Sequence, residues 1–266
     1  MSSAIVVYQY PSDNVAGDYA TIGVNTGTED ADYPSAYLVD GRPGRPAKLT
    51  TTSGSWVLAF GGATRIDIVA LGAHNLTAAT LQGNATNAWG APTFSQALTI
   101  PAVSADGHSG SAWLDLTAKT GYSAGGFQYW RLLVTSASSC AVGELWLGSG
   151  IRTLARAYAP GFTIEESQPV ITHMTEFLIP QTYVLGSRQR RLKLSFMSLS
   201  AAEAVILREW YRSMHGTGLT SIFVPDNITN DAWWVRHTED YTEKVTYRDL
   251  RDITMTLIEH ATGVPL

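Results

Sequence analysis

The sequence predicts a mainly β protein with two domains, an N-terminal β-sandwich and a C-terminal α+β domain. Two observations indicate this division. Residues 1–150 contain 19 of the 24 glycines but only 16 charged residues, whereas the shorter stretch 151–266 contains 25 charged residues. Short segments of alternating apolar and polar residues, separated by Gly, Asn, Pro and Ser, fill the first part, and the second part contains the clearest helical pattern. We therefore place the domain boundary at residue 150.

The first domain is predicted from a series of short strands. These strands are expected at 55–60, 65–71, 80–84, 112–116, 128–134 and 140–148. The first is expected to end at Gly61-Gly62, and in the second Ile66, Ile68 and Ala70 share one face. Because this half of the chain has no long stretch with a helical apolar stripe, it is typical of an all-β sandwich.

The second domain combines strands with one helix. Ser200 and Glu203 have the Ser-x-x-Glu spacing of a capping box, and apolar residues at helical spacing follow as far as Met214. We therefore predict one main helix at about 200–215. Strands are expected at 189–196, 220–226, 233–236, 243–248 and 252–259. This order predicts an α+β domain with an antiparallel sheet.

The composition excludes several classes of protein. The single cysteine, Cys140, rules out an intrachain disulfide framework and a Cys-based zinc site. A formal net charge of −5 argues against a nucleic-acid-binding protein, so we expect no specific nucleic-acid partner. The charge-free stretch 68–105 is interrupted by polar residues, Gly and Pro, so we expect no membrane insertion.

The sequence contains no motif that is typical of catalysis or of cofactor binding. Phosphate-binding and dinucleotide-binding glycine loops are absent, and so is the His-Glu-x-x-His zinc motif. The segment 107–111 lacks the last glycine of a Gly-x-Ser-x-Gly elbow. Adjacent carboxylates such as Glu239-Asp240 point to opposite faces of an extended chain, whereas a glycosidase needs two that face each other. We therefore expect a non-enzymatic protein with no catalytic, cofactor-binding or metal-binding residues.

Over about residues 30–150, the segments resemble the galactose-binding-like (discoidin-type) jelly roll in their order and spacing. The resemblance rests on Asp40-Gly41, on the aromatic-Arg-Leu strand at 127–132 and on the closing Glu-Leu strand at 144–148. It implies a jelly roll whose members bind sugars, lipids or proteins through loops at one end of the sandwich. The candidate glycan contacts in three such loops are Trp89, His74, Asn75, Asp106 and His108. Among them, Trp89 has the aromatic ring on which a sugar can stack.

Roughly over residues 151–266, the segments resemble tail-tube-related proteins of tailed bacteriophages. The resemblance rests on the helix cap and on the sequences at 223–226, 234–236 and 257–259. It implies a tail-tip or distal-tail (baseplate) structural protein of the virion that is assembled in the host cytoplasm. Such a protein would form a homo-oligomeric ring with threefold or sixfold symmetry, extend the tail tube, and dock fibres or receptor-binding proteins. Its partners would be tube, hub and fibre proteins, with host surface glycans as further ligands.

One dense basic cluster precedes the predicted helix. It consists of Arg188, Arg190, Arg191 and Lys193. The cluster is either a solvated strand face or an inter-subunit surface that meets Glu165 and Glu166, or Glu239 and Asp240, of the next copy. Contact with DNA inside a tube is the least favoured alternative. Two functions therefore stay open, a structural ring component and a carbohydrate-binding module that recognises host surface glycans.

Overall fold

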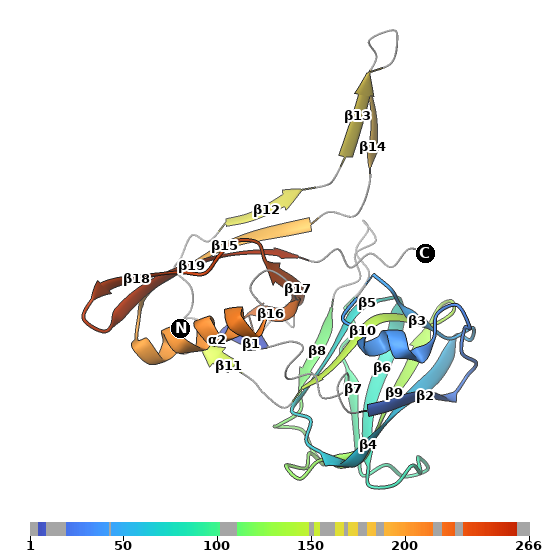
Figure 1. The fold of residues 1–266 in the computed structure, drawn as a ribbon. Helices are drawn as coiled ribbons and strands as arrows, with labels where there is room; N and C mark the ends of the chain where they lie inside the picture. The colour runs from blue at the N-terminus through green and yellow to red at the C-terminus, as the bar shows by residue number, and fades with distance from the viewer. Residues whose placement is uncertain are drawn as a thin grey trace.

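The computed structural model describes residues 5–8, 20–42, 44–101, 111–148, 152–154, 163–167, 170–174, 180–184, 189–214, 220–226 and 231–259. Within these ranges the protein is mainly β, and a β-sandwich lies beside a larger sheet that carries an α-helix (Figure 1). No helix in the described ranges combines the length and the apolar content needed to cross a membrane. The predicted combination of a β-sandwich with an α+β part that has one main helix is confirmed.

Two antiparallel sheets form the sandwich. The five-stranded sheet has the order β2 (Ala20–Thr26), β4 (Ser53–Thr64), β9 (Phe127–Ser136), β6 (Leu76–Asn84) and β7 (Phe94–Leu98). The four-stranded sheet has the order β3 (Ala47–Lys48), β10 (Ala141–Gly148), β5 (Ile68–His74) and β8 (Ala112–Asp115), and the short 3-10 helix η1 (Ser35–Val39) precedes β3. Alternate residues of the strands, such as Trp56 and Leu58 of β4 and Trp130 of β9, are buried between the two sheets.

The fourth strand is longer than predicted. It does not end at Gly61-Gly62 but continues to Thr64, and its pairing with β9 shifts register between Ala59 and Thr64. Glycines inside a strand favour such an irregularity because they have no side chain to pack. The end of the strand lies against Gly126, where φ is +74° and a Cβ atom would be 2.2 Å from the Thr64 backbone.

The larger sheet has eight strands and is antiparallel in every pair. Its order is β11 (Arg152–Leu154), β1 (Ile5–Tyr8), β16 (Ser221–Asp226), β17 (Asp231–His237), β19 (Leu250–Glu259), β15 (Gln189–Leu199) and β12 (Thr163–Ser167), with β18 (Thr242–Tyr247) paired to β19. The strands predicted at 189–196, 220–226, 233–236, 243–248 and 252–259 all occur in this sheet. The short edge strands β11 and β12 were not predicted.

The start of the chain belongs to the larger sheet. β1 pairs with β16 and also with β11, which follows the sandwich in the sequence. A division of the chain at residue 150 would assign β1 to the sandwich. Because β1 and β11 are neighbours in one sheet, the sandwich is instead an insertion between two strands of that sheet. The sequence Ile-Val-Val-Tyr favours a strand, but it does not identify the partner of that strand.

The helix α2 (Ala201–Ser213) packs on one face of the larger sheet (Figure 1). The Ser200 hydroxyl accepts a hydrogen bond from the Glu203 backbone N–H, and the Glu203 carboxylate accepts one from the Ser200 backbone N–H. This reciprocal pair is the predicted capping box. The residues of α2 that are buried against the sheet are Ala204, Leu207 and Trp210.

The sandwich packs on the other face of the same sheet, at β16 and β17. Adjacent residues of a strand point to opposite faces, so Trp233 joins the core under α2 while Trp234 faces the sandwich. The buried cluster at this junction contains Ile222, Val224 and Trp234 of the larger sheet and Ile68, Ala70, Trp113 and Trp146 of the sandwich. Gly72 permits this packing, since a Cβ atom there would lie 2.4 Å from Trp234 Nε1.

As a consequence of this junction, β5 is buried on both faces. Val69 points into the sandwich core, whereas Ile68 and Ala70 point towards the larger sheet. The prediction that Ile66 shares the face of Ile68 and Ala70 was wrong, because Ile66 lies in the sandwich core. The regular strand begins only at Ile68, so its alternation does not extend back to Ile66.

A hairpin of β13 (Val170–Met174) and β14 (Pro180–Val184) extends away from the rest of the molecule (Figure 1). Within the described residues it forms a separate two-stranded sheet. Ile171 and Met174 on β13 are 41% and 61% exposed. An isolated two-stranded hairpin is marginally stable in water at best. A contact that covers its exposed apolar residues would therefore stabilise this hairpin.

Candidate functional site

The outer face of the five-stranded sheet carries a single charge. Arg131 on β9 is the one charged residue in the five strands of this sheet. In the strand register it lies between Val57 of β4 and Gln82 of β6, and the same row continues to Gly23 of β2 and Ser95 of β7. Residues of one such row that point outward lie on a common surface.

Amide side chains hold the Arg131 guanidinium in place. Nε and Nη2 donate to Oε1 of Gln82 at 2.8 and 2.5 Å, and Nη1 donates to Oδ1 of Asn25 at 3.3 Å. Gln82 in turn donates its Nε2–H to the Ser95 hydroxyl at 3.2 Å. Burial lowers the pKa of Arg131 below its usual value, although a guanidinium stays charged at neutral pH.

Trp89 folds back from the β6–β7 loop onto this guanidinium. The Cζ atom of Arg131 lies 4.6 Å from the centroid of the Trp89 ring, within the range of a cation–π contact. The indole N–H donates to Oδ1 of Asn87 at 2.7 Å. The loop is also fixed by Asn84, whose Nδ2 donates to the Ala88 carbonyl at 2.6 Å. The half-buried ring is therefore held in one orientation before any ligand binds.

A shallow hollow of about 220 Å³ lies beside this pair, and we call it the Gly23 hollow. It is lined by Thr21, Ile22, Gly23, Val24, Asn25, Val57, Ala59 and Asn87. Apart from Gly23 itself and its two neighbours in the chain, no residue has an atom within 4 Å of the position that a Cβ atom of Gly23 would take, so the missing side chain leaves space there. Val57 and Ala59 supply apolar surface, and Thr21, Asn25 and Asn87 supply neutral hydrogen-bonding groups. This combination suits a polar, uncharged ligand group.

The predicted glycan contacts do not come together. His74 and Asn75 precede β6, whereas Trp89 follows it, and a strand of nine residues is about 30 Å long. His74 is buried, and the Asn75 side chain hydrogen-bonds to backbone groups of 139–141 and holds that turn in place. Asp106 and His108 lie outside the described residues. Of the predicted contacts that the structure describes, only Trp89 is connected to the Gly23 hollow, through its hydrogen bond to Asn87, which lines the hollow.

Two residues of the predicted inter-subunit surface, Arg190 and Glu166, lie opposite each other in one chain. Their strands β15 and β12 are paired, and Arg191 lies opposite Glu165 in the same register. Arg190 forms a bidentate ion pair with Glu259 at 2.7 and 2.5 Å, and its guanidinium lies 3.9 Å from the Trp233 ring centroid. The charge of Arg190 is therefore satisfied within the chain, so this charge by itself gives no reason to expect a partner on another copy.

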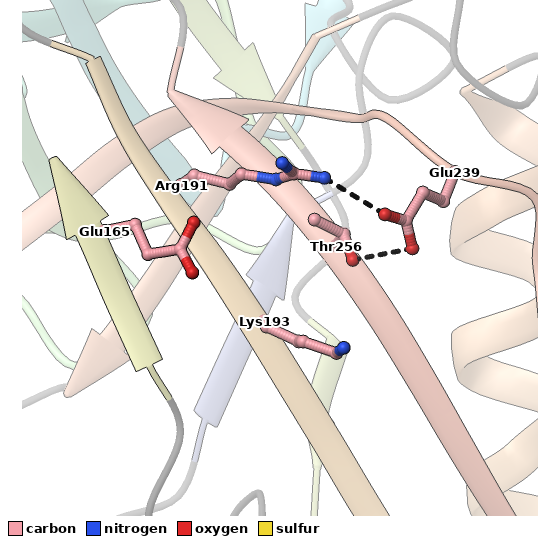
Figure 2. Close-up of a pocket in the computed structure, with 5 residues that line it drawn as sticks. All are labelled: Glu165, Arg191, Lys193, Glu239 and Thr256. Atoms are coloured by element: carbon pink, nitrogen blue, oxygen red, sulfur yellow. Dashed lines mark hydrogen bonds and ion pairs between the residues drawn. The ribbon is translucent and has the colours of Figure 1, made fainter. Parts of the chain in front are cut away.

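A second pocket of about 160 Å³ is lined by Glu165, Arg191, Lys193, Glu239 and Thr256, next to Arg190 and Glu166 in the sequence and the sheet (Figure 2). Arg191 donates to Glu239 at 3.0 Å, and the Thr256 hydroxyl donates to the other oxygen of Glu239 at 2.9 Å. Glu165 and Lys193 also line the pocket, and neither has an ion-pair partner among the described residues. Arg188 lies outside those residues. Arg191 and Glu239 are about half exposed and already paired, and the two acidic and two basic side chains of the pocket balance, so it has no net charge with which to attract a ligand.

We find no arrangement typical of a metal site or of a reactive nucleophile in the described part of the chain. No group of three or more His, Cys, Asp or Glu side chains converges there in a way that would hold a metal ion. The buried Cys140 thiol has a pKa raised to about 11 by its burial, so it is protonated at neutral pH. The Gly23 hollow with Trp89 and Arg131 is thus the best-defined candidate site.

No family model and no curated protein matches the sequence. Similar solved structures include a lectin domain of lectinolysin complexed with Lewis B antigen (TM-score 0.40, 13% identity, 52% of this chain and 98% of that chain). A fucose-binding module of Streptococcus pneumoniae matches with a TM-score of 0.38 and 12% identity, over 52% of this chain and 98% of the module. A GH29 fucosidase of Ruminococcus gnavus has TM-score 0.41 and 11% identity, and the match covers 53% of this chain but 27% of the fucosidase. At these scores the likeness does not identify a ligand for this chain.

Proposed function

We propose that this protein is a non-catalytic carbohydrate-binding protein whose sandwich holds a sugar in the Gly23 hollow beside Trp89. The observation that carries the proposal is the chemistry of the hollow, which has apolar surface at Val57 and Ala59 and neutral hydrogen-bonding side chains around it. A pyranose ring has an apolar face of C–H groups and a rim of hydroxyl groups. Apolar surface with a few placed polar groups is the general pattern of small-ligand sites.

The rigidity of the site supports the same proposal. The indole of Trp89 is fixed by Asn87 and by Arg131, so its ring loses little freedom when a ligand packs against it. Asn25 and Asn87 each line the hollow and also bind one member of the Trp89–Arg131 pair. The lectin domain and the fucose-binding module named above also bear the names of sugar-binding proteins, but the proposal rests on the hollow.

Gly23→Val is expected to weaken glycan binding at least about 10-fold, because the new side chain fills the hollow and displaces the sugar. The fold should tolerate the change, since the position is open and valine favours strands. The measurement is a glycan array followed by calorimetric titration of each oligosaccharide that binds.

Gly61→Val is the matched control, because Gly61 also lies in a strand of this sheet with open space at its Cβ position, outside the hollow. It should bind as the unchanged protein does, while Trp89→Ala should lose affinity in the same titration. An array with no binding at high protein concentration, or equal affinity of the Gly23 and Gly61 variants, would contradict the proposal.

A second candidate function is assembly into a ring as a structural component of a bacteriophage tail tip or baseplate. The observation that favours it is the hairpin of β13 and β14, which has no paired strand or helix beside it in the described residues and exposes Ile171 and Met174. A neighbouring copy that covers this hairpin would stabilise it, and a head-to-tail contact of this kind closes into a ring when the rotation permits. The partners would then be tube, hub and fibre proteins of the virion.

Met174→Asp is expected to dissociate such an assembly, because it places a charge in the apolar contact. Met197→Asp is the matched control, since Met174 and Met197 are 61% and 62% exposed but Met197 lies outside the hairpin on β15. Analytical ultracentrifugation gives the mass, and negative-stain electron microscopy shows whether rings form. A monomer at high concentration, or equal loss of the assembly in both variants, would rule out assembly through the hairpin.

A further inference from the structure

We propose that the sugar bound at the Gly23 hollow carries a carboxylate group, and that Arg131 binds this group. The inference rests on the proposed glycan-binding function and names the chemical class of the ligand, an acidic sugar of the uronic-acid or sialic-acid type.

Arg131 is a cation without a counter-ion in the part of the chain that the structure describes. It is the single charged residue in the strands of its sheet, and no carboxylate forms an ion pair with it among the described residues. Other partly buried arginines of the described chain are paired, for example Arg190 with Glu259 and Arg208 with Glu243. A partly desolvated charge that has no partner is costly, and an anionic ligand group removes that cost when it binds.

The amide contacts leave part of the guanidinium available. An arginine has five N–H donors, and three of them bind Gln82 and Asn25. Each terminal nitrogen therefore keeps one N–H that has no acceptor among the described residues. Two donors on one planar guanidinium match the two oxygens of a carboxylate, and such charge-assisted pairs are the strongest hydrogen bonds that a site of this kind can form.

The position of Arg131 suits a ligand that lies in the hollow. Val57 lies directly opposite Arg131 in the strand register and also lines the hollow. Asn25 lines the hollow and accepts a hydrogen bond from Arg131, so guanidinium and hollow share one side chain. Trp89 packs against the same guanidinium that Gln82 binds. A sugar ring in the hollow would thus have its substituents next to Arg131.

The test compares acidic sugars with their neutral counterparts on the full chain. The pairs are 3′-sialyllactose with lactose, and trigalacturonic acid with its methyl ester; lactose 3′-sulfate tests another anion. At low ionic strength we expect the acidic sugar of each pair to bind at least about 10-fold more tightly than the neutral one. This difference in affinity should shrink in about 0.5 M salt, which screens the charges. Arg131→Gln should abolish the difference, and Arg131→Lys, which keeps the charge but not the two parallel donors, should retain only part of it.

Arg45→Gln is the matched control, because Arg45 also packs on an aromatic ring of this domain, that of Tyr37, but has Asp40 beside it. Arg45→Gln should leave the preference for acidic over neutral sugars unchanged. Thermal unfolding shows whether Arg131→Gln is folded. If it is not, the test rests on the ratio of the affinities for acidic and neutral sugars in the unchanged protein, on the salt dependence of that ratio, and on Arg131→Lys.

Neutral sugars that bind at the hollow as tightly as the acidic ones would overturn this inference and leave the proposed function standing. Equal affinity for the sulfated sugar would overturn the choice of a carboxylate. An absence of binding to every sugar would overturn both.

Discussion

Replacing Trp234 with Ala is expected to lower the free energy of unfolding by about 3–5 kcal/mol. The side chain is fully buried at the junction between the sandwich and the larger sheet, where it contacts both parts. Its removal leaves a cavity that neither sheet can close without moving, because β5 of the sandwich and β16 are buried there as well. Urea unfolding followed by circular dichroism measures the loss.

Trp89→Ala is the control for this substitution. Trp89 is only half buried and packs on Arg131 through a cation–π contact near the surface. We therefore expect its removal to lower the free energy of unfolding by about 1 kcal/mol or less. Limited proteolysis should cut the Trp234 variant, and not the Trp89 variant, in the segments that connect the two parts. Equal losses of stability in the two variants would show that the junction adds no more to the fold than a surface contact does.

Acidification from pH 7.5 to 5.0 is expected to remove about 2 kcal/mol of stability through His237 alone. The imidazole of this residue packs edge-to-face with the rings of Trp210 and Tyr211, with centroids 4.8 and 5.3 Å from its own, and its Nε2 has no hydrogen-bond partner in the described residues. Burial lowers the pKa of His237 to about 4. The unfolded chain, with a histidine pKa of about 6.5, takes up the proton first. The contribution is therefore complete above pH 6.5 and is lost as the pH falls towards 4.

The measurement is the pH dependence of urea unfolding for the unchanged protein and for His237→Phe. The difference in unfolding free energy between pH 7.5 and 5.0 should be about 2 kcal/mol smaller in the variant, whatever its absolute stability. His173→Phe serves as the control, because His173 is exposed on the hairpin, and it should keep the full pH dependence. A slope that is unchanged in His237→Phe would assign the acid sensitivity to other groups.

The candidate site was predictable only in part. Trp89 is predictable as a contact because its aromatic ring, in a loop, can stack on a sugar, but its grouping with His74 and Asn75 was wrong. The direction of the strand between them was enough to exclude that grouping, since the turns before and after one strand lie at opposite ends of the sheet. Arg131 was assigned to a strand and was not considered as a ligand contact. Its signal in the sequence was that it is the single charge in a set of neutral strands.

Local patterns in the sequence were sufficient for α2, its cap at Ser200 and most strands, because the contacts that define these elements join residues close together in the chain. Only the tertiary structure decided which strands are neighbours. It paired β1 with β11 and β16 across the whole sandwich, and it buried β5 on both faces. It also brought Gly23, Val57 and Arg131 into one row. The physical reason is that strand register depends on contacts between distant segments, and a periodic pattern in one segment does not specify its partner.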